Sequence, residues 1–327
     1  MMALIGKNIE HAAQLLKEGN VVAIPTETVY GLAGNALDTR AITKIFETKR
    51  RPFFDPLIVH LPSWDAVNLY TKSIGLIVKK LLHTIPQGPL TVLLEKTSLI
   101  PDLVTSGSPR VALRVPGHVM ALELLNHLDF PLAAPSANLF GKTSPTRASH
   151  VNRQLGDSLD YILDGGPCAV GVESTILAEL DGRIVVYRLG GITLERISEI
   201  IGDGVEVLLA NKNETTLPGT LQHHYAPERN MILYDDRKAL LSALAQRKDE
   251  RVGLICFGQF DLPEGVNIKV FNLSDGENLT AAAAHYFDTL YQINTWKPDV
   301  ILAEKVPDVG LGRAINDRLM RGSMQTA

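Results

Sequence analysis

The sequence is poor in cysteine and contains no long apolar run. Cys168 and Cys256 are its two cysteines, far apart and without a Cys-x-x-Cys spacing. This argues against a disulfide framework or a zinc site, and it is typical of a cytosolic protein. No stretch approaches the roughly 20 apolar residues that cross a bilayer, so we expect a soluble, cytoplasmic protein with no membrane partner.

Positive charge is not in excess either. The chain has 32 Lys and Arg against 36 Asp and Glu, a formal net charge of -4. A general nucleic-acid binder neutralises phosphates with cations, so this balance disfavours that class. With 327 residues, 45% of them hydrophobic, the chain is long enough for two domains of about 100–150 residues each.

Three familiar catalytic motifs are missing. The chain has no Gly-x-x-x-x-Gly-Lys-Ser/Thr, no Gly-x-Gly-x-x-Gly and no Gly-x-Ser-x-Gly. It is therefore neither a P-loop enzyme nor a protein with the usual dinucleotide fingerprint or nucleophile elbow. The nine histidines show no metal-ligand spacing, so the protein itself supplies no assignable metal site.

Residues 1–210 predict an α/β domain with a twisted, mixed sheet. Strands and helices interleave there without the regular cadence of a doubly wound domain. Apolar runs predict strands at 21–24, 56–62, 90–94, 110–117, 131–138, 161–164, 171–176 and 183–191. Periodic or capped segments predict helices before Gly19, from Asp38 to Pro52, at 64–84, up to His127, and through Val151 and Leu155.

A linker and a second domain follow. Residues 211–230 have few apolar anchors and many helix and strand breakers, which is typical of a linker or lid. Residues 231–327 predict a small doubly wound, Rossmann-like α/β domain. Its expected strands are 231–234, 252–257, 268–273 and 300–303, and its expected helices are 237–246, 278–293 and 311–321.

The most informative stretch is 25–32, Pro-Thr-Glu-Thr-Val-Tyr-Gly-Leu, directly after the predicted strand 21–24. Open α/β sheets bind ligands at the ends of their strands. The helix that follows ends in Lys49, Arg50 and Arg51. Hydroxyls and backbone groups near a compact basic cluster suit a phosphate-bearing ligand.

Further polar residues stand at other predicted strand ends, and cations outnumber carboxylates among them. This favours an anionic ligand, a nucleotide or a carboxylate-bearing substrate, that the protein binds and transforms. Thr28 and Ser174 could instead satisfy backbone groups, and His60 could be a core histidine. The set comprises Thr28, Lys49, Arg51, His60, Arg110, Arg114, Ser136, Asn138, Ser144, Ser174 and Arg188.

Ordered motifs over most of the chain resemble those of the YrdC-like family. They are residues 25–32, Lys49-x-Arg51-Pro52, 56–60 (PLIVH), 88–91 (GPLT), 114–116 (RVP), 134–138 (APSAN), 164–167 (DGGP) and 171–175 (GVEST). Residues 224–227 (HYAP) and 310–315 resemble the linker and final helix of the long, two-domain threonylcarbamoyl-AMP synthases of this family.

The resemblance implies a fold, a reaction and partners. The fold is the YrdC-like twisted sheet with a concave, positive cavity. The reaction joins L-threonine, bicarbonate or CO2 and ATP, with Mg²⁺ accompanying ATP, into threonylcarbamoyladenylate and pyrophosphate. This nucleotidyltransferase step serves threonylcarbamoyladenosine modification of tRNA, so the downstream transferase complex and tRNA are possible partners.

The resemblance also assigns roles to residues. Lys49, Arg51, Ser136 and Asn138 would hold the ATP phosphates and act in catalysis. ATP would also be contacted by Asp55, Arg110, Ser144, Arg188 and, from the linker, Tyr225. L-Threonine would be contacted by Thr28, His60, Arg114, Ser174 and the backbone of Ala134. Family members usually have asparagine where Asp55 stands, so Asp55 would contact the triphosphate directly or through magnesium.

Two alternatives remain at this point. One is a protein of the same fold that only binds RNA, although the intact Lys49-x-Arg51 and Ser136-x-Asn138 pairs favour chemistry. The other is a carbamoyl-adenylate enzyme of hydrogenase maturation. That family adds acylphosphatase-like and zinc-finger modules, which this sequence lacks. The role of the C-terminal domain stays open.

Overall fold

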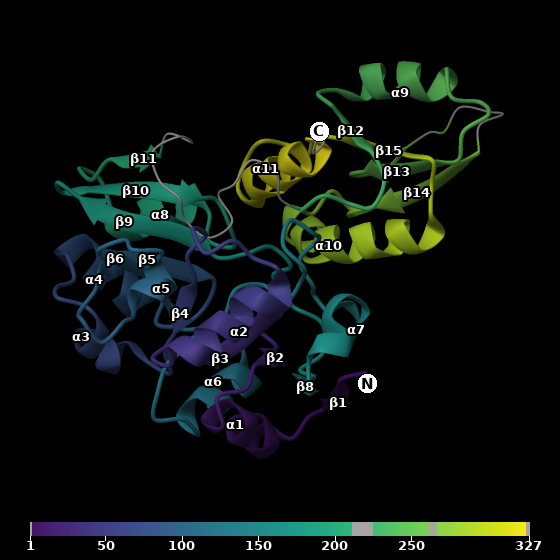
Figure 1. Cartoon of the computed structure of the whole chain (residues 1–327). Coiled ribbons are helices and arrows are strands. Elements are labelled where there is room, and N and C mark those ends of the chain that lie inside the picture. The colour runs from purple at the N-terminus through teal and green to yellow at the C-terminus, as the bar shows by residue number, and fades with distance from the viewer. Residues whose placement is uncertain (1, 211–224, 261, 263–266, 325–327) are drawn as a thin grey trace. The chain divides into compact units, whose positions relative to one another are not determined.

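The computed structural model describes residues 2–210, 225–260, 262 and 267–324, which form two compact units (Figure 1). The predicted linker lies mostly outside the described residues. Two short stretches that the sequence places in the catalytic domain, 141–143 and 170–172, are grouped with the second unit. The N-terminal unit comprises Met1–Phe140, Ser144–Ala169 and Glu173–Leu221, and the C-terminal unit comprises Gly141–Thr143, Val170–Val172 and Gln222–Ala327.

The N-terminal unit contains a mixed sheet of eleven strands in the order β1-β8-β2-β3-β7-β4-β6-β5-β9-β10-β11. The sheet contains both parallel pairs, such as β4 with β6, and antiparallel pairs, such as β2 with β3. The predicted mixed sheet is therefore confirmed. The strands are β1 Leu4–Gly6, β2 Val22–Ile24, β3 Gly31–Asn35, β4 Ile58–His60, β5 Leu90–Glu95, β6 Arg110–Arg114, β7 Leu132–Ala133, β8 Tyr161–Leu163, β9 Thr175–Leu180, β10 Arg183–Arg188 and β11 Val207–Leu209.

Helices surround this sheet. Helix α2 begins as predicted, because the Asp38 carboxylate accepts a hydrogen bond from the Arg40 N–H at 2.9 Å. It ends before Pro52, where Arg50 adopts a left-handed conformation with φ of 51°. The helices are α1 Ile9–Lys17, α2 Thr39–Lys49, α3 Val67–Tyr70, α4 Leu76–Thr84, α5 Asp102–Thr105, α6 Val119–Asn126, α7 Ala148–Leu155 and α8 Leu194–Ile201, with 3₁₀ turns at Trp64–Ala66 and Gly156–Ser158.

Alternation along the strands separates two cores. In β2, Val22 and Ile24 pack with α1 and α6 on one face, whereas Ala23 packs with α2, α4, α7 and α8 on the other. Farther along the first face, β4, β5, β6 and β9 contribute a small apolar patch. We call this the strand patch; its buried members are Ile58, Leu93, Ala112, Ile176 and Ala178.

The predicted helix over 64–84 is wrong in one respect: the segment forms a 3₁₀ turn, α3 and α4 with a break between them. Thr71 leaves the helix in an extended conformation and bridges to Lys96. Helix α4 then begins after Gly75, which offers no side-chain cap. Glu179 of β9 replaces the missing cap, since its carboxylate accepts hydrogen bonds from the Ile77 and Val78 N–H groups at 3.0 Å.

Strand β3 is not predicted by the sequence pattern. Its composition, Gly-Leu-Ala-Gly-Asn, is poor in the β-branched and aromatic residues that favour strands. It forms because both of its neighbours, β2 and β7, pair with it in antiparallel register. Tertiary pairing therefore overrides local preference at this position.

The C-terminal unit has a parallel four-stranded sheet in the order β12-β15-β13-β14. Helix α9 packs on one face through Leu240 and Leu244, while α10 and α11 lie on the other face (Figure 1). This confirms the predicted small doubly wound domain. Its elements are β12 Met231–Tyr234, α9 Arg237–Ala245, β13 Val252–Cys256, β14 Ile268–Asn272, α10 Leu279–Trp296, β15 Val300–Glu304 and α11 Leu311–Ser323.

The structure describes the two cysteines, the possible metal-binding groups and the apolar character of the helices. Cys168 and Cys256 are buried free thiols, and burial raises the pKa of each to about 12. Within the described ranges, no group of three or more His, Cys, Asp or Glu side chains could hold a metal ion. None of the described helices is both long and apolar enough to span a bilayer.

Replacing Glu179 by alanine is expected to destabilise the protein, because the first turn of α4 loses the side-chain cap that Glu179 supplies. The expected loss is about 1 kcal/mol, the usual cost of removing a cap. Urea denaturation at neutral pH measures it. Glu199→Ala is the matched control: Glu199 is 68% exposed and forms a surface ion pair with Arg196, so its loss is expected to cost less than about 0.5 kcal/mol. Equal costs for the two variants would contradict the capping role.

Candidate active site

Strand register places several predicted site residues on one face of the sheet. His60 of β4 lies opposite Arg114 of β6, and Ile58 lies opposite Ala112 in the strand patch. Cross-strand partners and alternate residues of a strand share a face. The side chains of His60, Arg110 and Arg114 therefore project from the face that carries the strand patch. Ser174, two residues before Ile176, has the same alternation.

Arg188 reaches this face through an irregularity in β10. Val186 lies opposite Leu177, but Arg188 lies opposite Ile176 because the register shifts between them. Such a bulge re-aims a side chain. The Arg188 Nε donates to the Ser174 carbonyl at 3.0 Å and its Nη2 donates to Ser174 Oγ at 2.9 Å. The bulge thus joins Arg188 to Ser174.

A glycine keeps the backbone near Ser174 close to the neighbouring chain. A Cβ on Gly190 would lie 2.3 Å from the Glu173 carbonyl oxygen and 2.4 Å from the Ser174 carbonyl carbon. No side chain fits there without moving the backbone. Gly190 therefore allows the close approach that positions Ser174, whose Oγ also lies 2.7 Å from Thr91 Oγ1.

Arg114 is buried and held from two sides. Its Nε donates to the Gly88 carbonyl at 3.1 Å, and its Nη2 donates to Glu27 Oε1 at 2.6 Å and Thr28 Oγ1 at 2.9 Å. Glu27 also accepts the Gly117 N–H at 2.8 Å. The Arg114 Nη1 makes no hydrogen bond to any described residue. One edge of a rigidly held guanidinium is therefore available to an anion.

His60 is buried beside Arg114. Burial, reinforced by the Arg114 charge, lowers the pKa of His60 to about 3, so the imidazole is neutral at physiological pH. Its Nδ1 lies 3.3 Å from the Ile58 carbonyl. That carbonyl also accepts the Ala134 N–H at 3.0 Å, which brings the predicted Ala134 backbone next to His60.

Lys49 connects directly to the predicted Ser136-x-Asn138 pair. The Lys49 ammonium donates to the Ser136 carbonyl, and to the Asn138 carbonyl at 2.6 Å. Its side chain is buried, and this burial, with help from Arg51, lowers the pKa of Lys49 well below its ordinary value. The contacts show that Lys49 fixes the backbone of this loop.

Arg51 and Asp55 form a buried ion pair, with Arg51 Nη2 2.9 Å from Asp55 Oδ1. Arg51 also donates to the carbonyls of Asp55 at 3.0 Å and Pro56 at 2.8 Å. Burial raises the pKa of the Asp55 carboxyl, while the charges of Arg51, Lys49 and Arg188 oppose that rise. Asp55 therefore lies amid three cations.

The remaining predicted residues differ in how they are placed. Ser144 is buried and donates to Glu173 Oε1 at 2.8 Å. Arg110 is half-buried, and its side chain makes no hydrogen bond or ion pair within the described part of the chain. Tyr225 belongs to the C-terminal unit, where it is buried with its ring 5.4 Å from that of Phe287. Its place over the nucleotide stays a prediction.

Three residues that hold the site were missed by sequence reasoning: Glu27, Thr91 and Glu173. Each stands inside one of the motifs that resemble the family: Glu27 beside Thr28, Thr91 in the GPLT segment and Glu173 beside Ser174. Their signal is membership of the motif rather than residue type. They face other protein groups, since Glu27 pairs with Arg114 and Glu173 accepts from Ser144.

Family models match both parts of this chain. A model described as "Telomere recombination", the Sua5/YciO/YrdC domain, matches residues 14–190. A second, "Threonylcarbamoyl-AMP synthase, C-terminal domain", matches residues 192–323. The site therefore belongs to a YrdC-like enzyme domain.

More particularly, the chain belongs to the long, two-domain Sua5 branch of the Sua5/YciO/YrdC family. It is 38% identical over 325 residues to threonylcarbamoyl-AMP synthase of Pyrococcus abyssi, covering 96% of this chain and 94% of the relative. It is 40% identical over 323 residues to the Bacillus subtilis protein of the same name, covering 96% and 92%. The structure of P. abyssi Sua5 complexed with L-threonine matches with a TM-score of 0.90 and 35% identity, covering 99% of this chain and 98% of that one.

Acid is expected to destabilise the protein partly through His60. Its pKa is about 3 in the folded protein and about 6.5 when unfolded. The unfolded state therefore binds the extra proton, and stability present above pH about 6.5 is lost as the pH falls toward 3.

Between pH 6.5 and 5, His60→Gln is expected to reduce this loss by about 1.6 kcal/mol relative to the unsubstituted chain. Urea denaturation at both pH values measures the difference, which is independent of any constant cost of the substitution. His83→Gln serves as control, because His83 is exposed. The expectation fails if all three proteins lose stability equally.

Proposed function

We propose that this chain is a threonylcarbamoyl-AMP synthase that uses L-threonine, bicarbonate or CO2, and ATP. The neutral threonine amine adds to CO2 and loses one proton to solvent, which gives a carbamate anion. A carbamate oxygen then bonds to the α-phosphorus of ATP while the bond to the β-phosphate bridging oxygen breaks. The products are threonylcarbamoyladenylate and pyrophosphate.

The threonine end of the site rests on Arg114. Its Nη1 has no partner among the described residues, while its Nε and Nη2 are fixed by Gly88, Glu27 and Thr28. A guanidinium held in this way binds a carboxylate with defined orientation. Neutral His60, Ser174 and the Ala134 backbone line the same region and supply uncharged contacts for the rest of the amino acid.

The phosphate end rests on Lys49, Arg51 and the loop of Ser136 and Asn138. Lys49 donates to two carbonyls of that loop, and its ammonium has three donors in all. Fixed cations and loop groups of this kind stabilise charge that builds on the α-phosphate and on departing pyrophosphate, without reorganising during the reaction. Arg188 and Ser144 extend the polar site, and Arg110 and Tyr225 remain proposed nucleotide contacts.

Magnesium would reach this site with ATP. Neither oxygen of the buried Asp55 carboxylate accepts a hydrogen bond from the described residues, although Oδ1 faces Arg51. Mg²⁺ commonly uses one or two carboxylates together with substrate phosphates. Asp55 fits as that single protein ligand, and the ion would offset negative charge on the triphosphate.

The reaction needs no strong general base from the protein. The carbamate is already an anion, and His60 is buried with its pKa lowered to about 3. The protein's contribution is therefore to hold two anionic substrates close together and to neutralise them. The product would pass to a transferase complex acting on tRNA in the cytoplasm.

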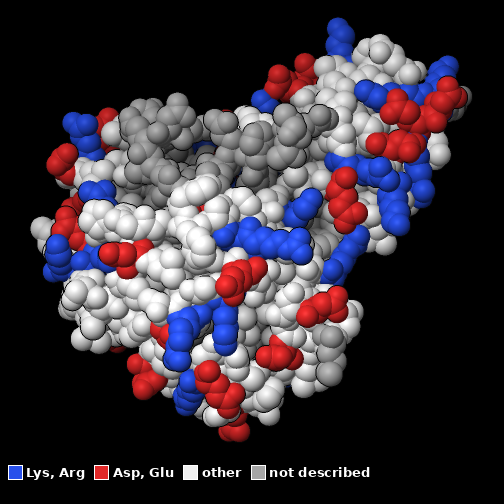
Figure 2. Space-filling view, viewed as in Figure 1, with Lys and Arg blue, Asp and Glu red and all other residues white. Residues whose placement is uncertain are grey.

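Direct RNA binding as the sole function is less well supported. On the face of the N-terminal unit visible in Figure 2, cationic and anionic side chains are intermingled. The net charge of -4 points the same way, since non-specific RNA affinity requires clustered cations.

The observation that carries the proposal is buried Arg114, whose Nη1 has no hydrogen-bond partner among the described residues and which has Thr28 and His60 beside it. The test is threonine-dependent release of pyrophosphate from ATP with bicarbonate and magnesium. Arg51→Ala is expected to lower kcat/KM by about 100-fold or more, because it removes a fixed charge near the reacting phosphates.

Arg183→Ala is the matched control, since Arg183 is 58% exposed and pairs with Glu206 at the surface; it should retain full activity. Release of pyrophosphate without regard to threonine would refute the substrate. RNA binding with no turnover would favour the binding-module alternative.

Asp55→Asn tests the magnesium contact. If Asp55 holds the ion, the substitution should raise the Mg²⁺ concentration for half-maximal activity by about fivefold, because an amide oxygen binds Mg²⁺ more weakly than a carboxylate. Titration of Mg²⁺ at fixed ATP measures this, with the exposed Asp129→Asn as control. An unchanged Mg²⁺ requirement with a lower KM for ATP would mean that Asp55 only repels the triphosphate.

A further inference from the structure

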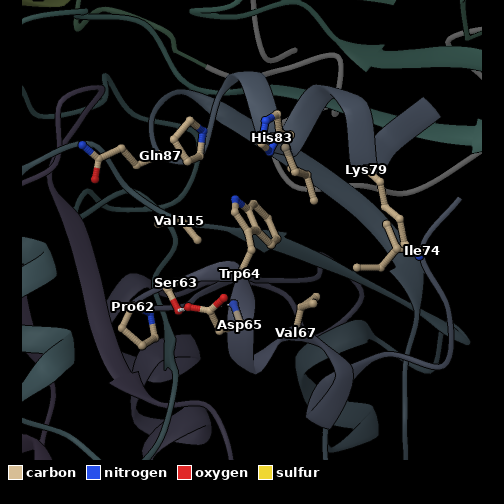
Figure 3. Close-up of a pocket in the computed structure, with 12 residues that line it drawn as sticks. Pro62, Ser63, Trp64, Asp65, Val67, Ile74, Lys79, His83, Gln87 and Val115 are labelled. Carbon is tan, nitrogen blue, oxygen red and sulfur yellow. Dashed lines mark hydrogen bonds between the residues drawn. The ribbon is translucent and has the colours of Figure 1, made fainter. Parts of the chain in front are cut away.

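The N-terminal unit contains a pocket that no predicted site residue lines. Its volume is about 460 Å³, and its walls come from the 3₁₀ turn at Trp64–Ala66, from α4 and from the adjoining segments (Figure 3). Val67, Leu82 and Val115 form a buried apolar floor. Volumes of about 300–1,000 Å³ with an apolar lining and a few polar groups are typical of small-molecule sites.

Trp64 stands at the centre of the lining in Figure 3. Its Nε1 is shielded from solvent and donates no hydrogen bond to any described residue. A buried N–H without an acceptor is uncommon in native proteins and costs about 1–3 kcal/mol. Because Nε1 is shielded, a molecule in the pocket would contact the indole ring rather than this N–H.

The polar groups of the pocket are arranged by charge. Lys79 and His83 lie one turn apart on α4, and the exposed side chain of neither makes a hydrogen bond or ion pair with the residues that the structure describes. Asp65 lies on the other side of Trp64, where its carboxylate accepts a hydrogen bond from Ser63 Oγ at 3.0 Å (Figure 3). The α4 side of the pocket is therefore lined by the donors of Lys79 and His83. The Asp65 carboxylate on the opposite side already accepts a hydrogen bond from Ser63.

We propose that this pocket binds a small monocarboxylate with an apolar, preferably aromatic, body. The carboxylate would pair with Lys79 on the α4 side, and it would accept a hydrogen bond from His83. The apolar body would lie on the indole and on the floor of Val67, Leu82 and Val115. Asp65 disfavours a ligand that is anionic at both ends.

The pocket is separate from the threonine site but shares backbone with it. Gln87 and Val115 line the pocket, and they are the chain neighbours of Gly88 and Arg114. The Gly88 N–H donates to the Val115 carbonyl at 2.8 Å, and the Gly88 carbonyl accepts from Arg114 Nε at 3.1 Å. The pocket ligand would thus contact the segments that hold Arg114 without touching its guanidinium.

The test uses Trp64 as reporter in the full-length chain. The chain has two tryptophans, so Trp296→Phe leaves Trp64 as the sole one. Titration with 3-phenylpropionate should change its emission saturably, and the affinity should fall as salt is added. The uncharged 3-phenylpropanamide should bind more weakly by about fivefold or more, because it cannot form the charge-assisted hydrogen bond.

Two lysine variants in the same background make the test specific. Lys79→Met should weaken 3-phenylpropionate binding by about fivefold or more. Lys80→Met makes the same change on the same helix, but Lys80 does not line the pocket and donates instead to the Ile201 carbonyl at 3.0 Å. It should leave affinity within about twofold of its parent. Circular dichroism and thermal melting confirm that each variant is folded.

Three results would each overturn the proposal. The first is no saturable emission change up to about 10 mM 3-phenylpropionate, which corresponds to no useful affinity. The second is equal affinity for the acid and the amide. The third is equal affinity in the Lys79→Met and Lys80→Met chains.

Discussion

Among the described residues, the interior of the N-terminal unit holds four Lys and Arg cations and two carboxylates, Asp55 and Glu173, and their need for partners shapes the surrounding loops. A buried charge costs several kcal/mol unless it is paired and hydrogen-bonded. Each cation meets this need by donating to backbone carbonyls, so the same bonds that stabilise the charge also fix the loops. The pairs are Lys49 with Ser136 and Asn138, Arg51 with Asp55 and Pro56, Arg114 with Gly88, and Arg188 with Ser174.

Much of the fold follows from local pattern, and the failures have definite causes. The capped helix after Asp38 and the alternating strands can be predicted from the sequence, because a cap and a two-residue period are local signals. The break within 64–84 cannot be predicted in this way, because the apolar period continues across it. What stops the helix is the pairing of Thr71 with Lys96, and what restarts it is Glu179, about 100 residues away in sequence.

The candidate site likewise has parts that the sequence predicts and parts that depend on contacts between distant segments. Resemblance to a family indicates which residues matter, and the structure brings Lys49 to Ser136 and Asn138, and Arg114 to Thr28. The resemblance does not indicate which protein groups these residues contact when no substrate is bound. Glu27 is invisible to an argument that looks for cations facing an anion, because its role is to orient Arg114. Supporting partners of this kind depend on three-dimensional proximity rather than on motif spacing.

The register shift in β10 has a consequence for how the family can vary. Side chains reach the site because alternate residues of a strand point to the same face. Inserting or deleting a single residue within β4, β6 or β9 would therefore turn every later side chain of that strand to the opposite face. In β10 one additional residue has already been accommodated at Tyr187, and it is what aims Arg188 toward Ser174. Insertions and deletions should therefore accumulate in the surface loops. In these four strands, the number of residues between the preceding turn and the site residue should stay constant. Here the number of residues in a strand is as much a determinant of chemistry as their identity.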